Sequence, residues 1–406
     1  KRLAVITGKL VSIISLVFHI GAGASWPGEI ALRIKPDILS LLSVNIDKGI
    51  IFVAGTNGKT TTALMIKTIL EAQDLNVVHN ASGANLLNGI VSACIQNASW
   101  TGNFYADYGV FEVDENSLSG VLKSVKSGKS IKSGKSIKSK VILVLLNLFR
   151  DQLDRYGEVD VIAEKWINSF EPQRAEDRNI RKTNATTIIA NADDPLIAHI
   201  AQSGTRPGLE AGVRYFGLDD PAQFMKKMEH ATDSIFCPSC GTRLVYKGVY
   251  YSHIGDWNCP TCKNNRPKPD ISTWDYPLPG LYNRYNTLAA VATAKILGIS
   301  DQQIQESKKE VFSMTLVRWN PARDLMRFPS DIFRMQREID QLVDSVFRRD
   351  TDEDLFPSVW SPAVDVAESD NEYLVKVELP GINKEDVKVT VQDSVLTILG
   401  EKKQET

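Results

Sequence analysis

The sequence lacks a hydrophobic run long enough to cross a bilayer, which takes about 20 predominantly apolar residues in a helix. The only membrane-like run, LVSIISLVFHIGAG at residues 10–23, is shorter and contains His19. Arg2 and Lys9 flank it as in a signal peptide, but no convincing small-residue cleavage site follows. We therefore expect an amphipathic helix here, buried or docked on a surface, rather than a membrane anchor.

Disulfide-forming cysteines and net charge are also scarce. The chain has five cysteines, four of them in two CxxC pairs, which predicts a reducing, cytoplasmic compartment. Its 47 basic and 49 acidic residues leave a formal net charge of −2, so the chain as a whole has no field that would attract nucleic acid. With 406 residues, two or three domains can each bury a core.

Apolar strands that alternate with helices make up most of the first three quarters of the chain. Residues 49–73 predict a strand, a glycine turn and a helix. Further buried strands are expected within 108–115, 140–149 and 186–195, and a helix within 277–300. This alternation predicts an α/β fold, with a parallel sheet covered by helices on both faces.

A repeated segment, KSVKSGKSIKSGKSIKSK at residues 123–140, interrupts this pattern. Lysine, serine and glycine at this density cannot form a core, so we expect an expanded, solvated loop. Because its basic charge is concentrated, binding of phosphate or lipid headgroups is the alternative.

The stretch GTNGKTTT at residues 55–62 follows a strand and opens a helix, as a phosphate-binding P-loop does. Gly55 and Gly58 allow the backbone to approach a phosphate, and the amides of the turn can solvate it. Lys59 is expected to reach the β- and γ-phosphates, and Thr60 to offer its hydroxyl to Mg²⁺. The spacing departs from the common P-loop pattern, because Val53 stands where that pattern has its first glycine. A chance glycine turn is therefore the alternative.

This spelling of the loop resembles the Mur ligase superfamily, which joins amines to carboxylates with ATP. FEVDE at 111–115, NLFRDQLDRYGE at 147–158, NADDP at 191–195 and GLYNRYNTLAA at 280–290 resemble further segments of that family. The resemblance implies catalytic roles for Lys59, Glu112 and Asp151, with Glu112 and Thr60 on Mg²⁺. It implies ATP contacts for Gly55, Thr56, Asn57, Gly58, Lys59, Thr60, Thr61, Asn191, Asp194 and Asn283.

Four cysteines form a compact group: CPSC at residues 237–240 and CPTC at 259–262. Two CxxC knuckles suit a tetrahedral Zn²⁺ with all four positions filled, so we expect Cys237, Cys240, Cys259 and Cys262 to hold a structural zinc in a ribbon inserted at 233–270. Two redox pairs or four unconnected thiols are the alternatives.

An inserted zinc ribbon, and Gln152 where most Mur ligases have histidine, resemble the MurT subfamily over residues 1 to about 312. That resemblance implies ATP-dependent amidation of the D-glutamate α-carboxyl of lipid II through an acyl phosphate. It also implies a glutaminase partner of the GatD type that supplies ammonia, and a substrate at the inner membrane face. A helical segment at 1–48 would precede the central domain at 49–312, and HNASGANLLNG at 79–89 would line the substrate side.

From Met314 the sequence changes character. Residues 314–360 resemble the N-terminal arm of a small heat-shock protein, and residues 361–406, which alternate as short strands, resemble the first half of its α-crystallin sandwich. The resemblance to Mur ligases implies a third domain at this point that closes on ATP. Because a different sequence stands in its place here, we expect impaired ligase activity. Half a sandwich leaves edge strands unpaired, which predicts low stability or self-association.

Two other functions compete with an amide ligase. The first is a chaperone-like oligomer in which the ligase part is inactive. The second is a zinc-ribbon protein that binds nucleic acid, which the near-neutral charge and the lack of interleaved aromatic and basic residues disfavour.

Overall fold

The computed structural model describes residues 1–17, 25–80, 83–126, 140–149, 159–170, 186–203, 212–225 and 234–307, and the backbone of four strands between 364 and 400. The chain divides into two units, Lys1–Phe328 and Pro329–Thr406. The expected boundary at Met314, the arm at 314–360 and most of the Lys/Ser/Gly repeat lie outside the described residues. Those expectations therefore stay predictions.

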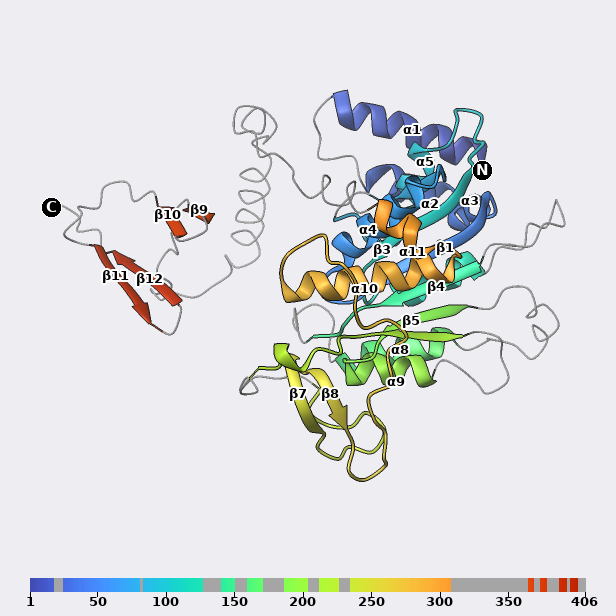
Figure 1. Cartoon of the computed structure of the whole chain (residues 1–406). Helices are drawn as coiled ribbons and strands as arrows, with labels where there is room; N and C mark the ends of the chain where they lie inside the picture. The colour runs from blue at the N-terminus through green and yellow to red at the C-terminus, as the bar shows by residue number, and fades with distance from the viewer. Residues whose placement is uncertain are drawn as a thin grey trace, which may run out of the picture. The chain divides into compact units, whose positions relative to one another are not determined.

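A six-stranded parallel sheet forms the centre of the first unit, in the order β2-β3-β1-β4-β5-β6 (Figure 1). The strands are β1 (Ile46–Ala54), β2 (Val77–His79), β3 (Ala106–Val113), β4 (Lys140–Leu145), β5 (Thr187–Asn191) and β6 (Val213–Phe216). The predicted α/β fold with a parallel sheet is confirmed.

The sequence predicts four of these strands because each contains a run of apolar residues, as strands covered on both faces do. Residues 49–54 of β1 and 141–145 of β4 are all buried. The two strands that the sequence did not predict, β2 and β6, have three and four residues. Segments this short carry no readable periodicity, and their pairing depends on the neighbouring strand.

Helices cover both faces of the sheet (Figure 1). One face packs against α4 (Lys59–Glu71), α10 (Leu281–Ile296) and α11 (Asp301–Glu306). The other packs against a layer made of α1 (Arg2–Val17), α2 (Trp26–Ile34), α3 (Ile38–Ser43), α5 (Leu87–Gln96), α6 (Leu118–Lys126), α8 (Val159–Phe170) and α9 (Pro195–Ser203).

The N-terminal apolar run forms part of α1, so the helix expected from residue 10 is confirmed as far as Val17. Ala4 and Val5 are buried in the core, whereas Leu3 and Leu10 on the same helix are exposed. In the part of the chain that the structure describes, no helix has both the length and the apolar character that a bilayer span needs.

The insertion that carries the cysteines follows β6 and the short 3₁₀ helix η2 (Pro221–Gln223). Its centre is an antiparallel hairpin of β7 (Val245–Tyr251) and β8 (Ile254–Asn258). Tyr250, Tyr251 and Ile254 pack into the core beneath α10, so the hairpin is joined to the main sheet by apolar contacts.

The second unit contains two antiparallel hairpins among its described residues. β9 (Val364–Glu368) pairs with β10 (Tyr373–Val377), and β11 (Val387–Gln392) pairs with β12 (Val395–Gly400). The short alternating strands expected in 361–400 are therefore confirmed.

Candidate functional site

The carboxyl ends of the central strands meet at one edge of the sheet. Ala54, the last residue of β1, pairs with Val113 of β3 on one side and with Leu145 of β4 on the other. The chain runs outward from β1 to β2, returns to β3, and then crosses to β4 on the opposite side. In open parallel sheets, ligands bind outside the carboxyl ends of the strands at such a reversal of strand order.

The glycine loop occupies this edge. Gly55 and Gly58 have φ angles of 143° and 87°, which side chains rarely adopt, and a Cβ on Gly58 would overlap Asn286 Oδ1. Helix α4 starts directly after the loop at Lys59, and no side chain caps its N-terminus. The first amides of a helix have no intrahelical acceptor, so this end can receive an anion.

Asn147, two residues beyond β4, fastens the loop to the sheet. Its backbone oxygen accepts from Thr56 N at 2.9 Å, and its side-chain Oδ1 accepts from Asn57 N at 2.9 Å. In return, Asn147 Nδ2 donates to Asn57 O at 3.1 Å, and Phe149 N donates to Thr56 Oγ1 at 3.0 Å. The segment after β4 thus fixes the first half of the loop.

Lys59 folds back over the loop. Its Nζ donates to Gly55 O at 2.6 Å and Thr56 O at 3.0 Å, and forms an ion pair with Glu115 Oε1 at 3.1 Å. Burial raises the pKa of the Glu115 carboxyl, and the charge of Lys59 opposes that shift. Among the described residues, the carboxylate that contacts Lys59 is therefore one whose charged form is disfavoured by burial.

Glu112 and Thr60, the expected Mg²⁺ pair, are in direct contact. The Thr60 hydroxyl donates to Glu112 Oε2, and Gly83 N donates to Oε1 at 3.1 Å. Glu112 is 1% exposed, and Asn80 holds its backbone, since Asn80 Oδ1 accepts from Glu112 N and Asn80 Nδ2 donates to Glu112 O. A hard divalent cation prefers oxygen ligands of this kind.

Two residues expected to contact nucleotide have their polar atoms engaged elsewhere. Asn191 donates to Leu146 O and accepts from Asp193 N, which closes the turn after β5. Asp194 Oδ1 accepts from the first amides of α9, at Leu196 and Ile197. The structure gives both side chains turn and cap roles, so nucleotide contacts for them stay predictions.

Asn283 lies on the first turn of α10 and is half-buried. Its Nδ2 donates to Pro279 O, and its Oδ1 accepts from Asn286 Nδ2. Asn286 is the residue of this segment that reaches the loop: its Oδ1 accepts from Thr62 Oγ1 at 3.3 Å and lies against Gly58. Asp151 and Gln152 lie outside the described residues.

The sequence pattern alone indicated no role for Asn147, Asn286 or Glu115. All three lie within segments that resemble the Mur ligase family, so the sequence did point to these segments. What the sequence could not indicate was which polar residue of each segment faces the loop, because that depends on strand register and helix rotation.

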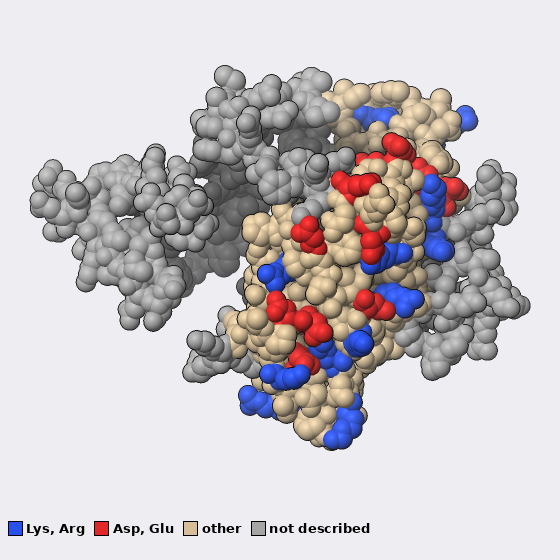
Figure 2. Space-filling model, in the orientation of Figure 1, with Lys and Arg blue, Asp and Glu red and all other residues tan. Residues whose placement is uncertain are grey.

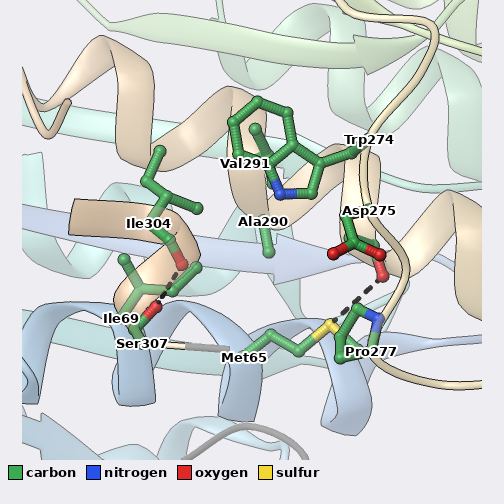
Figure 3. A pocket seen from close by; sticks show the side chains of 10 residues that line it. Met65, Ile69, Trp274, Asp275, Pro277, Ala290, Val291, Ile304 and Ser307 are labelled. Atoms are coloured by element: carbon green, nitrogen blue, oxygen red, sulfur yellow. Dashed lines mark hydrogen bonds between the residues drawn. The ribbon is translucent and has the colours of Figure 1, made fainter. Parts of the chain in front are cut away.

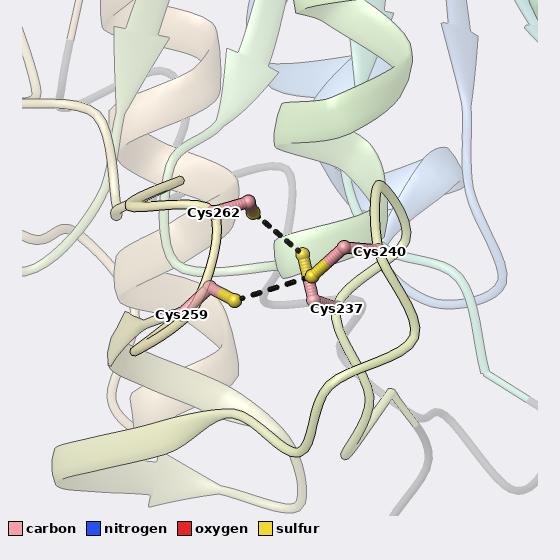
Figure 4. A group of neighbouring side chains, drawn as sticks. All are labelled: Cys237, Cys240, Cys259 and Cys262. Atoms are coloured by element: carbon pink, nitrogen blue, oxygen red, sulfur yellow. Dashed lines mark hydrogen bonds between the residues drawn. The ribbon is translucent and has the colours of Figure 1, made fainter.

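The four cysteines converge from two turns (Figure 4). Cys237 Sγ lies 3.6 Å from Cys262 Sγ, Cys240 Sγ lies 3.5 Å from Cys259 Sγ, and all four sulfurs lie within 4.8 Å of one another. A tetrahedral zinc with Zn–S bonds of about 2.3 Å needs sulfurs about 3.8 Å apart. A hydrogen bond with the Thr242 hydroxyl lowers the pKa of the exposed Cys240 thiol to about 6, which favours the thiolate.

The insertion is anchored to the turn after β5 by a buried ion pair. Arg266 Nε donates to Asp193 Oδ1 at 2.6 Å, while Tyr285 Oη and Leu218 N donate to Oδ2. Burial raises the pKa of Asp193 to about 6, although Arg266 opposes the shift. This carboxylate joins the insertion, β6 and α10 to one point of the sheet.

A small apolar pocket lies between α4, α10 and α11 (Figure 3). Met65, Ile69, Trp274, Val291 and Ile304 contribute to its lining, and none of its lining residues belongs to the glycine loop. The face in Figure 2 carries basic and acidic side chains side by side. Neither feature points to a second ligand.

Comparison with known proteins identifies both units. The family model described as the Mur ligase middle domain matches residues 53–294, and that of the Hsp20/alpha crystallin family matches residues 365–406. A solved structure of a pseudomurein peptide ligase type C from Methanothermus fervidus is 23% identical with a TM-score of 0.46, covering 66% of this chain and 50% of that one.

Two curated relatives are similar over most of the first unit. The MurT subunit of lipid II isoglutaminyl synthase (glutamine-hydrolyzing) from Staphylococcus aureus is 31% identical over 301 residues, 70% of this chain and 60% of its own length. Its counterpart from Streptococcus pneumoniae is 32% identical over 311 residues, 71% of this chain and 61% of its own length. The chain thus spans about three fifths of these relatives. It belongs to the Mur ligase family through its middle domain, which is joined to a segment of the Hsp20/alpha crystallin family.

Proposed function

We propose that the first unit binds ATP with Mg²⁺ at the glycine loop and activates a carboxylate for amide formation. The observation that carries this proposal is the uncapped N-terminus of α4, with Lys59 on one side and the Thr60–Glu112 pair on the other. Phosphoryl transfer needs little covalent help from a protein, only positioning and charge stabilisation, and this loop has the groups for both.

In this proposal, Lys59 leaves Glu115 and contacts the β- and γ-phosphates, while the loop amides solvate the remaining oxygens. Thr60 and Glu112 hold Mg²⁺, which neutralises charge on the phosphates. Asn147 and Asn286 keep the loop in shape from opposite sides. Asp151, outside the described residues, remains a proposed catalytic residue on the family resemblance alone.

The proposed substrate follows from the relatives rather than from the loop. Both MurT subunits belong to lipid II isoglutaminyl synthases, so we propose the D-glutamate α-carboxyl of lipid II as the carboxylate, activated as an acyl phosphate. Ammonia would come from a glutaminase subunit, because those enzymes hydrolyse glutamine. The reaction would take place in the cytoplasm at the inner membrane face.

The cysteine group is proposed to hold a structural Zn²⁺. Its donor set fits, because four sulfurs from two knuckles already lie close to tetrahedral spacing and leave no position for a substrate. The zinc would stabilise a segment whose own buried cluster is small: Leu244, Trp257, Cys237 and Cys259, packed on Ala198 of α9.

The test is a nucleotide titration of the whole chain in Mg²⁺. We expect Lys59→Ala to weaken ATP binding by about a hundredfold or more, because the cation on the phosphates is lost. Lys67→Ala is the matched control, since Lys67 lies on the same helix and, among the described residues, pairs with Glu71 rather than with a residue of the loop. Equal affinity in Lys59→Ala and wild type would overturn the proposed site.

A second candidate, an oligomeric chaperone, is favoured by the Hsp20 match over residues 365–406. Among the described residues of the second unit, β9–β10 and β11–β12 form separate two-stranded sheets, and the outer edges of such sheets can pair with another copy of the chain. Suppression of client aggregation that is unaffected by ATP and by Lys59→Ala would support this function over the ligase.

A further inference from the structure

His253 lies at the tip of the β7–β8 hairpin and is fully buried. Tyr251 pairs with Ile254, so the turn between the strands consists of Ser252 and His253. Ser252 adopts a φ of 48°, in the left-handed region that tight hairpin turns use. The hairpin therefore presents the imidazole ring at a fixed position in the first unit.

The ring of His253 contacts the segment that leaves β4. Its Nε2 lies 3.3 Å from Asp194 Oδ2, and the same oxygen accepts from Leu148 N at 3.0 Å. The ring also packs against Phe149, with centroids 4.8 Å apart. Because a carboxylate oxygen accepts hydrogen bonds, Nε2 is the donor in this contact when it carries the ring proton.

Leu148 and Phe149 connect His253 directly to the glycine loop. Phe149 N donates to Thr56 Oγ1, and the preceding residue, Asn147, fastens Thr56 and Asn57. Leu148 and Phe149 thus connect the tip of the cysteine-bearing insertion to the first half of the glycine loop.

The hairpin does not need His253 for its attachment. Trp257 Nε1 donates to Ala192 O, Gly255 N donates to Asp193 O, and Arg266 pairs with Asp193. His253 Nδ1, by contrast, is buried without a hydrogen-bond partner among the described residues. A buried polar atom left unpaired is unfavourable, so an apolar side chain would suit simple attachment better.

We propose that His253 is a positioning residue that holds the end of β4 against the glycine loop, so that the metal-binding insertion sets the affinity of the loop for Mg·ATP. The ring does so through Asp194 and Phe149, and it touches no nucleotide itself. The inference rests on the proposed nucleotide site.

The experiment measures Mg·ATP binding and thermal unfolding of the whole chain, as wild type, His253→Phe and His253→Gln. Phenylalanine keeps ring packing on Phe149 but loses the donor, and glutamine keeps a donor near the position of Nε2. We expect His253→Phe to weaken binding about tenfold at an unchanged unfolding temperature, and His253→Gln to recover most of that loss.

His199→Phe is the matched control. His199 also joins the sheet to the insertion, since its Nδ1 lies 3.3 Å from Ser239 Oγ, but it contacts the knuckle and not the end of β4. We expect its Mg·ATP affinity to equal that of wild type. A loss equal to that of His253→Phe would mean that any disturbance of the insertion weakens binding, and would overturn the role of His253.

Removal of the metal with a chelator tests the coupling. Binding should weaken in wild type but change little further in His253→Phe, where the connection is already cut. Normal Mg·ATP affinity in both His253 variants, with Lys59→Ala still inactive in binding, would sink this inference and leave the nucleotide site intact. Loss of the fold in both His253 variants would assign the residue a purely structural role.

Discussion

The cysteine cluster and the glycine-loop site are built in opposite ways. The four thiols all come from residues 237–262, in two turns that flank a single hairpin, β7–β8. The glycine-loop site combines residues 55–60 with Glu112 of β3, Asn147 from the segment after β4, and Asn286 of α10.

This difference decides how each site responds to damage. A local site depends on its own ligands and can fail while the sheet stays folded. A composite site depends on every element that presents a group to it, so substitutions far apart in the sequence should weaken the same ligand. His253 would be the point at which the two sites meet.

The largest expected effect comes from Gly58→Ala. The new methyl group would overlap Asn286 Oδ1, and alanine disfavours a φ of 87°. We expect Mg·ATP affinity to fall about a hundredfold or more, with metal content unchanged. Gly120→Ala on α6, which has open space around it, should bind normally. Nucleotide binding that survives in Gly58→Ala would remove the argument for a close approach at the loop.

The next effect is on the metal. Cys259→Ser removes a buried ligand, and we expect bound zinc to fall to about a tenth or less, with new proteolytic cleavage within 234–266. Cys94 is buried on α5, outside the group of four cysteines, so Cys94→Ala should have the same zinc content as wild type. If zinc content is the same in Cys259→Ser and wild type, the four thiols are not a metal site.

Asn286→Ala and Asn283→Ala compare the structural and the family-based assignments within one helix. Asn286 contacts Thr62 and Gly58, so its loss should weaken Mg·ATP binding about tenfold. Asn283 is half-buried and supports Asn286 through one hydrogen bond, so its loss should weaken Mg·ATP binding about twofold. A larger effect at Asn283, measured in the same titration, would favour direct nucleotide contact there.

The smallest effect concerns Glu115 and pH. Burial raises the pKa of Glu115, so its charge is neutralised at a higher pH than that of an exposed glutamate as pH falls. Protonation frees Lys59 from its ion pair, so wild-type affinity should rise on acidification relative to Glu115→Gln. At neutral pH, Glu115→Gln should bind Mg·ATP about threefold more tightly than wild type. Parallel pH profiles for the two proteins would show that Glu115 does not restrain Lys59.

Much of the fold could be predicted because its signals are short-range. The strands β1, β3, β4 and β5 each contain a run of apolar, buried residues, and the loop at 55–58 lies between a strand and a helix. β2 and β6 could not be predicted, since strands of three and four residues exist only by pairing with β3 and β5. The sequence placed Asn191 and Asp194 at the carboxyl end of β5, but it could not indicate which groups their side chains contact.

Residues close together in the chain were enough to predict the glycine loop at 55–58 and the group of four thiols, because backbone conformation and cysteine spacing depend on near neighbours in the sequence. The tertiary structure alone decided that Asn147 and Asn286 support the loop, that Glu115 holds Lys59, and that His253 reaches the end of β4. Those contacts join residues dozens to hundreds of positions apart, and their geometry follows from strand order and helix packing, which no local pattern encodes.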